Sequence, residues 1–253
     1  MHVVILAAGR GSRLGPLGDD TPKWLLRVGD ATIADRQLAG IAEAGADTPV
    51  SSLSVVGGHA LEALEHYVSA RGVDGPAVIE NPDYEAINNW YSVLLAARAL
   101  PAEGDQRLVI LNGDLFARPE WYAEFIRAAA RTAEDALIAV DLARNLTDES
   151  MKVAARGEDQ GVLDAIGKVG IESPVGEYVG MLMARGAALE AFRSRLESFV
   201  GREEHRNEWY ERAVGLTAAA GTDWRIWGTP DSDWVEIDDD GDFEQATRLA
   251  ADF

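Results

Sequence analysis

The N-terminal stretch from Met1 to Leu25 constrains the fold of this chain most strongly. Val3 to Ala8 is a short apolar run rich in β-branched residues, and the glycine-rich sequence GRGSR follows it at residues 9–13. This order predicts a buried strand that runs directly into a loop. Glycines allow consecutive backbone N–H groups to surround an anion, while Arg13 and Lys23 add positive charge. The stretch therefore predicts a loop that holds phosphate at the end of the first strand.

The overall charge of the chain limits the partners that it can bind. The formal net charge is −20 and the sequence pI is near 4.5. A surface of this sign repels a phosphate backbone, so we expect no nucleic-acid partner. A small anionic ligand fits only a pocket in which local cations outweigh that field. The lysines are informative for this reason, because they occur only at Lys23, Lys152 and Lys168.

Cysteine is absent from the chain, which excludes disulfides, thiolate zinc sites and a cysteine nucleophile. This composition suits a reducing compartment. The first apolar run spans about six residues with no basic region before it, which is too short for a signal peptide or a membrane span. We therefore expect a cytoplasmic protein without a membrane partner.

Strand-like and helix-like segments alternate through the first half of the chain. Short apolar runs predict strands at residues 53–56, 77–79, 108–111 and 136–141. Helical spacing of apolar residues predicts helices at 31–44, 59–70, 88–100 and 120–131. Such alternation predicts a Rossmann-like three-layer α/β/α sandwich with a mostly parallel mixed sheet. Ligands of such sheets lie at the carboxyl ends of the strands, where Gly9 and Asp114 fall.

The pattern changes after residue 141. Strand-like segments separated by glycines and charged turns predict a small antiparallel extension over one end of the sheet, at 151–155, 161–169 and 178–183. The remaining patterns predict helices at 186–200 and 207–220, a strand at 234–237 and a closing helix at 243–251. We expect a single domain over residues 1–253, with a nucleotide-binding half at about 1–141 and an acceptor-binding half at about 142–253, because no repeat or linker composition divides the chain.

Spacing within the first loop separates the common phosphate-binding sequences. A dinucleotide fingerprint requires glycine at position 14, where this chain has Leu14, and no acid follows the second strand at the expected distance. A Walker loop requires Gly-Lys followed by Ser or Thr, and the Gly-Lys pair at 167–168 is followed by Val169. An NAD site and a Walker site are therefore disfavoured.

The N-terminal motif resembles the signature of the sugar-phosphate nucleotidyltransferase superfamily, L-A-A-G-x-G-[ST]-R-[LM] followed by P-K. The chain carries LAAGRGSRL at residues 6–14, with Pro22 and Lys23 after it. The resemblance implies a loop around a nucleoside triphosphate, with Arg13 and Lys23 as catalytic cations on its phosphates. The nucleotide-binding residues that it implies in this loop are Leu6, Ala7, Ala8, Gly9, Gly11, Ser12, Arg13 and Lys23.

A second resemblance concerns the sequence ENPDYEAINNWYSVLLAARAL at residues 80–100. It is similar to the N-x-x-Y-x-x-x-N-N-x-Y-S segment of bacterial choline-phosphate cytidylyltransferases and their relatives, which implies nucleotide contacts from Asn81, Asn88, Asn89 and Ser92. Short amides offer a donor and an acceptor together, as a pyrimidine edge requires. Asparagine is also a common helix N-cap, so capping is the alternative role for one of the pair Asn88 and Asn89.

Two aspartates are candidates to bind the Mg²⁺ ion that accompanies a triphosphate. Asp114 directly follows an apolar strand, and Mg²⁺ in such sites uses one or two carboxylates with phosphate oxygens. The sequence WVEID at 234–238 resembles a near-terminal W-x-E-I-D segment of the same family, which implies Asp238 as the second ligand. Alternation along that strand places Glu236 on the same face, as a contact to the acceptor. A calcium loop is not supported, because Thr247 stands where an EF-hand requires glutamate.

Two lysines in the second half are candidates to bind the phosphate of an acceptor. Lys152 in MKV and Lys168 in IGK resemble segments of bacterial members of this branch. A lysine on an edge strand is also a common guard against aggregation, which is the alternative role.

Further acceptor contacts are implied by glutamate and aromatic residues. Glu177 and Tyr178 belong to a G-E-Y-x-G stretch that lies beside the acceptor in the family. Trp209 and Tyr210 suit a cage for a quaternary ammonium group through cation–π attraction. The alternative is core packing, which is the usual role of aromatic residues at helical spacing.

These features together predict a Mg²⁺-dependent cytidylyltransferase that transfers CMP from CTP to a small phosphate or phosphonate and releases pyrophosphate. Phosphocholine, 2-aminoethylphosphonate and polyol phosphates remain open as acceptors. A phosphate monoester is mostly a dianion at neutral pH, so no general base is required. The alternatives are a sugar-1-phosphate uridylyl-, thymidylyl- or guanylyltransferase and a non-catalytic nucleotide-binding regulator. The sequence leaves the oligomeric state open, a homodimer included.

Overall fold

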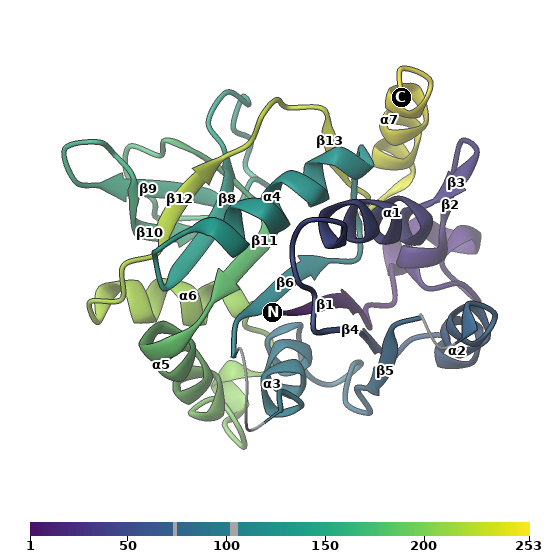
Figure 1. Cartoon of the computed structure of the whole chain (residues 1–253), viewed down its shortest axis with the longest axis horizontal. Coiled ribbons are helices and arrows are strands. Elements are labelled where there is room, and N and C mark those ends of the chain that lie inside the picture. The colour runs from purple at the N-terminus through teal and green to yellow at the C-terminus, as the bar shows by residue number, and fades with distance from the viewer. Residues whose placement is uncertain (73–74, 102–105) are drawn as a thin grey trace.

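The computed structural model describes residues 1–72, 75–101 and 106–253, which include a nine-stranded mixed sheet (Figure 1). In spatial order its strands are β5 (Ala77–Glu80), β4 (Ser52–Gly57), β1 (His2–Ala7), β6 (Leu108–Asn112), β11 (Gly176–Ala184), β8 (Ala136–Asp141), β12 (Arg225–Gly228), β10 (Val162–Gly167) and β9 (Lys152–Arg156). Strand β1 pairs in parallel with both β4 and β6, so Ile5 stands beside Val55 and Leu111. Because parallel strands end at the same edge, the loop after β1 lies next to the end of β6.

The half of the sheet beyond β6 is largely antiparallel. Strand β11 lies between β6 and β8 and runs antiparallel to both, while β8 and β12 are parallel. We predicted that residues 178–183 belong to an extension at one end, but the structure places them at the centre of the sheet. Their side chains are buried throughout, as expected for a strand covered on both faces. The outer antiparallel pair is formed by β9 and β10.

Strand β12 was not predicted. Its sequence, RIWG, is four residues long and combines a charged residue and a glycine with two apolar side chains. Such a segment shows neither alternation nor a continuous apolar run. Its pairing with β8 therefore depends on the surrounding fold, in which Ile226 stands beside the buried Ile138.

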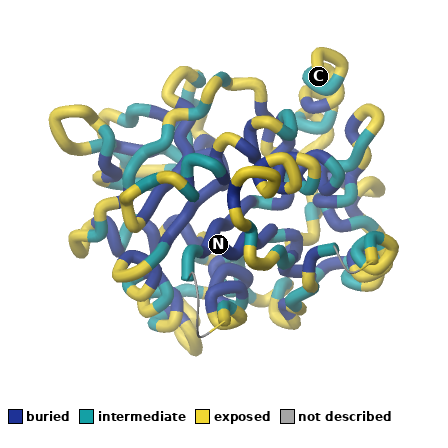
Figure 2. The backbone as a smooth tube through the Cα atoms, viewed as in Figure 1, coloured by how far each residue is buried: buried dark blue, intermediate teal, exposed yellow. Residues whose placement is uncertain are grey.

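Two layers of helices cover the sheet (Figure 1). One face carries α1 (Ile33–Gly45) and α4 (Pro119–Arg131), and the other carries α3 (Trp90–Arg98), α5 (Gly186–Glu197) and α6 (Tyr210–Ala219). Helix α2 (Leu61–Ser69) lies beside β5. Alternate side chains of β1 point to opposite faces of the sheet, so Val3 packs in one core and Val4 in the other. Figure 2 shows the central strands buried between these layers, which confirms the predicted three-layer sandwich.

A small two-stranded sheet joins distant parts of the chain. Strand β7 (Leu115–Ala117) follows β6 and pairs antiparallel with β13 (Trp234–Glu236). Helix α7 (Asp240–Ala250) comes next and begins three residues before the predicted position of 243. The reason is a cap, because the Asp239 side chain accepts hydrogen bonds from the backbone N–H groups of Gly241 and Asp242. The pairing of β7 with β13 carries the C-terminal segment to the end of β6.

Short elements complete the described chain. Strands β2 (Arg27–Val28) and β3 (Ala31–Thr32) form a hairpin, and turns of 3-10 helix occupy Ser12–Leu17, Lys23–Leu25 and Glu203–His205. Helix α1 begins at Ile33 rather than at 31, because Thr32 forms a capping box with Asp35. Among the described residues, no helix has the length and apolar character that crossing a membrane requires.

Candidate active site

The loop after β1 is fixed from behind by His59. The backbone N–H of His59 donates to Ala8 O at 3.0 Å, and its ring Nε2 lies 2.7 Å from Gly18 O. The histidine side chain is buried. These two contacts hold the beginning and the far side of the loop in one conformation.

Lys23 lies against the backbone of the same loop. Gly11 has a φ of +62°, and a Cβ at this position would lie 2.9 Å from Lys23 Cγ. Glycine is therefore required for both conformation and space. The next residue, Trp24, is fully buried and donates from Nε1 to Gln37 Oε1 at 3.0 Å, which anchors Lys23 to helix α1.

Two cations and two carboxylates meet at the carboxyl edge of β1 and β6. The Lys23 ammonium donates to Asp238 Oδ1 and lies 3.4 Å from Asp114 Oδ2. Arg13 Nη2 donates to the other oxygen of Asp238 at 2.6 Å. The structure thus brings together the two predicted phosphate-binding cations and the two predicted metal ligands.

The backbone explains why Asp114 and Asp238 lie together. Asp114 directly precedes β7, Asp238 lies two residues after β13, and these strands pair with Glu236 opposite Leu115. The N–H of Ile237 also donates to Asp114 O at 3.0 Å. This pairing holds two carboxylates that are distant in sequence on either side of Lys23.

The carboxylates of this site influence one another. Burial opposes ionisation of Lys23, but Asp114 and Asp238 raise the pKa of its ammonium group. Burial opposes ionisation of the Asp238 carboxyl group as well, yet Lys23 and Arg13 hold its pKa below the ordinary value. The pKa values of Asp114 and Glu236 are raised instead, because lost hydration of the carboxyl groups and the neighbouring carboxylates oppose ionisation, although Glu236 as a whole residue is exposed. The site therefore contains more carboxylate charge than Lys23 alone compensates.

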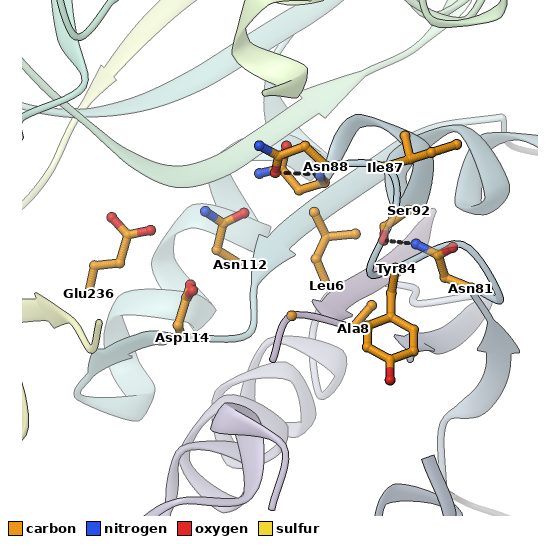
Figure 3. A pocket seen from close by; sticks show the side chains of 12 residues that line it. Leu6, Ala8, Asn81, Tyr84, Ile87, Asn88, Ser92, Asn112, Asp114 and Glu236 are labelled. Carbon is orange, nitrogen blue, oxygen red and sulfur yellow. Dashed lines mark hydrogen bonds between the residues drawn. The ribbon is translucent and has the colours of Figure 1, made fainter. Parts of the chain in front are cut away.

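Two adjoining hollows flank this cluster of charges. The loop hollow lies between the β1 loop and β6 and is lined by Leu6, Ala7, Gly9, Gly11, Lys23, Trp24, Gly113 and Asp114. The first cavity opens beside it and is lined by Leu6, Ala8, Gly9, Asn81, Tyr84, Ile87, Asn88, Asn89, Ser92, Asn112, Asp114 and Glu236 (Figure 3). Asp114 borders both hollows. Ser12 is exposed and lines neither of them.

The predicted amides line the first cavity, but most of their polar atoms bind the protein itself. Asn81 donates to Ser92 Oγ at 2.9 Å and accepts from the backbone N–H of residue 83 at 3.0 Å. Asn88 donates to Asn207 O and accepts from the N–H of Asn89. Asn89 accepts from the N–H of Tyr210 at 3.0 Å, and its own Nδ2 has no partner in the described part of the chain.

The capping role considered for the asparagine pair is not formed by the Asn89 side chain, while a nucleotide contact stays a prediction. Asn89 is the N-cap residue of α3, but its side chain forms no cap hydrogen bond. The pair instead joins the start of α3 to the segment before α6, because Asn88 and Asn89 bond to residues 206–210. Each amide has two N–H donors, of which Asn81 and Asn88 each use one within the protein, whereas Asn89 uses neither within the described residues.

Asn112 was not predicted as a site residue, although it lines the first cavity. The NGD sequence at 112–114 was the available signal, because Asn112 ends β6 two residues before Asp114. Its Oδ1 accepts a hydrogen bond from the Tyr210 hydroxyl at 2.9 Å.

A second cavity lies on the other side of Glu236. It is lined by Arg13, Arg144, Thr147, Glu149, Ser150, Lys168, Glu177, Trp234, Val235, Glu236, Asp238, Asp239 and Asp242. Arg144 was not predicted, because an isolated arginine in the turn after β8 carries no motif. Its guanidinium stacks 4.0 Å above the Trp234 ring, and its Nε lies 3.5 Å from Glu177 Oε2. Asp238, which lines this cavity, accepts a hydrogen bond from Lys23, which lines the loop hollow.

The two predicted lysines have different positions. Lys168 borders the second cavity, where its Nζ lies 3.1 Å from Glu149 Oε2 and 5.3 Å from the centre of the Trp209 ring. Lys152 does not border it and instead donates to the backbone carbonyl of Lys168 at 2.9 Å. Lys152 therefore supports the turn that carries Lys168.

The predicted aromatic contacts lie behind the cavities. Tyr178 and Tyr210 are buried, and their hydroxyl oxygens are 2.8 Å apart. Trp209 is 42% exposed, with Lys168 over its ring. Burial of Tyr210 prevents it from forming one wall of an open cage with Trp209.

Glu211 is a buried acid close to the same tyrosines. It is 6% exposed, and its Oε2 has no hydrogen-bond partner among the described residues. Burial raises the pKa of Glu211 to about 7, Asp114 adds to the effect, and Tyr210 and Lys168 oppose it.

The donor set at Asp114 and Asp238 fits a magnesium ion bound together with phosphate. The described residues contain no cluster of three or more His, Asp or Glu side chains arranged as a complete metal site. Mg²⁺ commonly uses one or two carboxylates and takes its remaining ligands from phosphate and water. Asp114 and Asp238 meet that requirement, and the excess of carboxylate charge around Lys23 favours a cation.

Comparison with known proteins places the chain among nucleotidyltransferases. Residues 3–207 match the family described as MobA-like NTP transferase domain. CMP-5′-(3-aminopropyl)phosphonate synthase of Streptomyces rubellomurinus is 32% identical over 97% of this chain and 38% of that protein. Choline-phosphate cytidylyltransferase of Streptococcus pneumoniae is 30% identical over 40% of this chain and 41% of that protein. N-acetylmuramate alpha-1-phosphate uridylyltransferase of Neisseria meningitidis is 33% identical over 51% of this chain and 54% of that protein.

The same fold is found in a solved structure of CTP:phosphocholine cytidylyltransferase from Streptococcus pneumoniae. Its TM-score is 0.75 at 18% identity, covering 98% of each chain. The chain matches between 38% and 54% of the lengths of the three relatives compared above. These comparisons confirm the resemblance drawn from the two motifs. The chain belongs to the MobA-like NTP transferase family.

Proposed function

We propose that this chain is a Mg²⁺-dependent cytidylyltransferase that transfers CMP from CTP to a small phosphate or phosphonate. The observation that carries the proposal is the meeting of Arg13, Lys23, Asp114 and Asp238 at the border of two cavities. One cavity offers amides for a base, and the other offers cations for an anionic acceptor. Two relatives whose names describe CMP or cytidylyl transfer support the choice of nucleotide.

The triphosphate is assigned to the loop hollow. Backbone N–H groups of the glycine-rich loop surround its oxygens, and Lys23 and Arg13 neutralise the charge that builds up during transfer. A magnesium ion held by Asp114 and Asp238 would supply further charge neutralisation at the phosphates. Lys23 is well placed for this role, because Asp114 and Asp238 keep it protonated.

The chemical step needs no proton transfer. An acceptor oxygen attacks the α-phosphorus, the new P–O bond forms, and the bond from the α-phosphorus to the bridging oxygen breaks as pyrophosphate leaves. A phosphate dianion is already deprotonated near neutral pH. The chain therefore acts by holding two anions in line and stabilising the charge on them.

The acceptor is assigned to the second cavity. Arg13, Arg144 and Lys168 line it and suit a phosphate or phosphonate group. Glu149, Glu177 and Glu236 line the same cavity and suit a cationic amine. A cavity with both signs of charge favours a zwitterionic acceptor of the aminophosphonate or phosphocholine type over a polyol phosphate.

A panel of acceptors tests the proposal. The purified chain, with Mg²⁺ and CTP, is offered phosphocholine, 2-aminoethylphosphonate, 3-aminopropylphosphonate and inositol 1-phosphate. Pyrophosphate release and the mass of the CMP conjugate are measured. We expect turnover with a zwitterionic acceptor and little with inositol 1-phosphate. Pyrophosphate release with none of the four would contradict the assignment of the second cavity.

A sugar-1-phosphate uridylyltransferase is the second candidate. One relative is named as a uridylyltransferase, and it is 33% identical over about half of this chain. The loop motif does not distinguish the two, because the superfamily signature that it resembles is common to both kinds of enzyme. Turnover of UTP with a sugar 1-phosphate would support this candidate. Binding of nucleotide without any pyrophosphate release would instead indicate a regulator.

A further inference from the structure

Asn112 is held in one orientation from behind the first cavity. Its Oδ1 accepts a hydrogen bond from the buried Tyr210 hydroxyl at 2.9 Å. Its Nδ2 lies over Gly180, where a Cβ would approach within 2.6 Å, so glycine there provides room for the amide. The described residues offer no acceptor to Nδ2, which leaves this donor for a ligand in the cavity that Asn112 lines.

The direction of each hydrogen bond in this group follows from its chemistry. An amide oxygen can only accept, so the Tyr210 hydroxyl hydrogen is committed to Asn112 Oδ1. The hydroxyl of Tyr178 lies 2.8 Å from that of Tyr210 and must therefore be the donor in that contact. In this order Tyr178 donates to Tyr210 and Tyr210 donates to Asn112 Oδ1, so the amide oxygen faces Tyr210 and Nδ2 is left for the cavity.

Asn112 lies between the two ends of the first cavity (Figure 3). At one end are Asn81, Tyr84 and Ser92, and at the other are Glu236 and Asp114, of which Asp114 also borders the loop hollow. If a base occupies the first end and phosphates the second, the sugar occupies the space between them. A nucleotide presents oxygen acceptors there in the form of its ribose hydroxyls.

We propose that Asn112 Nδ2 donates a hydrogen bond to a ribose hydroxyl oxygen of the bound nucleotide, and that Tyr210 is the positioning residue that fixes this donor. The inference rests on the proposed function, because it takes the ligand to be CTP. It makes Asn112 a residue that distinguishes ribonucleotides from deoxynucleotides. Tyr178 supports Tyr210 but does not touch Asn112.

The test compares CTP with 2′-deoxyCTP and 3′-deoxyCTP in the intact chain. Both the dissociation constant and kcat/KM are measured for the wild type and for Asn112→Leu, Tyr210→Phe and Tyr178→Phe. Leucine has nearly the shape of asparagine without its donor. The two tyrosine variants are a matched pair, because each removes one buried hydroxyl but only Tyr210 bonds to Asn112. Thermal unfolding of each variant verifies the fold.

We expect the wild type to favour CTP over at least one deoxynucleotide by roughly 10-fold, the effect of one hydrogen bond. Asn112→Leu should reduce this ratio to about one, Tyr210→Phe should reduce it several-fold, and Tyr178→Phe should leave most of it. Equal losses in the two tyrosine variants would overturn the positioning role. A wild-type ratio near one, or an unchanged ratio in Asn112→Leu, would overturn the assignment of Asn112.

The two proposals fail in different ways. A wild type that binds CTP with the expected ratios but releases no pyrophosphate would contradict the proposed function and support the role of Asn112. Turnover of CTP with an unchanged ratio in Asn112→Leu would support the proposed function and contradict the inference. A wild type that does not bind CTP at all would overturn both.

Discussion

Arg13 Nη2 lies 2.6 Å from Asp238 Oδ2, although 225 residues separate them in the chain. The contact joins the glycine-rich loop at the start of the chain to the segment that follows β13. It also lowers the pKa of Asp238 together with Lys23, against the effect of burial. Segments from near the two ends of the chain therefore meet in one cluster of charges.

Among the cations of the site, Lys23 is expected to be the one whose substitution lowers activity most. Replacing it by methionine removes the charge that lies between Asp114 and Asp238 while keeping most of the side-chain volume. We expect kcat/KM to fall by at least about 100-fold, because a donor to the reacting phosphates is lost. Lys23→Arg is the matched control and should retain part of the activity. Steady-state kinetics with equal activity in Lys23→Met and the wild type would contradict the assignment.

Asp114 is expected to be necessary for turnover and dispensable for folding. Burial and the neighbouring Asp238 raise its pKa against the effect of Lys23, so ionised Asp114 is less favourable in this site than in water. Asp114→Ala should abolish pyrophosphate release and leave the melting temperature unchanged or higher. Asp240→Ala, an exposed acid two residues after Asp238, is the control and should keep its activity. An active Asp114→Ala variant would exclude Asp114 as a ligand of an essential metal.

Arg144 is expected to act on the acceptor and not on the nucleotide. It lines the second cavity and is fixed by stacking on Trp234, while Lys152 lies outside and bonds to a backbone carbonyl. Arg144→Gln should raise the KM for the acceptor by roughly 10- to 100-fold with little change in the KM for CTP. Lys152→Met should have a smaller effect on the acceptor and lower the melting temperature. A larger acceptor effect in Lys152→Met would reverse this assignment.

The sequence predicted several separate segments of the site but not the contacts that bring them together. The β1 loop, Asp114 and Asp238 were found because each carries a motif at the end of a strand. Arg144 was missed because its position depends on stacking against Trp234, a contact between segments 90 residues apart. Local patterns contain no signal for such a contact.

Long-range contacts also explain the differences in the fold. Residues 178–183 were placed at the edge because antiparallel strands and turns surround them in sequence, yet β11 pairs with β6 and β8 at the centre. Tyr210 was predicted as an acceptor contact because it forms an aromatic pair with Trp209 in a sequence that also contains acidic residues. Its burial against Tyr178 and Asn112 depends on the packing of α6 over the sheet.

Glu211 is expected to make stability depend on pH. Its pKa is about 7 in the folded chain against an ordinary value of 4.5, so the unfolded chain loses this proton first as pH rises. The stability that the protonated carboxyl contributes is therefore fully present below about pH 4.5. It decreases as the pH rises from about 4.5 to about 7. Glu211→Gln keeps a neutral side chain at every pH.

The comparison of wild type and Glu211→Gln isolates this effect. Between pH 5 and pH 8, the free energy of unfolding of the variant should rise relative to the wild type by roughly 2 kcal/mol. Urea unfolding at several pH values measures it. A difference between the two proteins that does not change with pH would show that Glu211 is not the titrating group.

The central claim is that the site transfers CMP. The most direct measurement is a competition in which the chain receives equal concentrations of CTP, UTP, dTTP and GTP with Mg²⁺ and the preferred acceptor. Mass spectrometry of the products then reports which nucleotide was transferred. The account predicts that the CMP conjugate dominates the products and that its formation requires Lys23 and Asp114. A product mixture in which another nucleotide dominates, or in which all four appear equally, would contradict it.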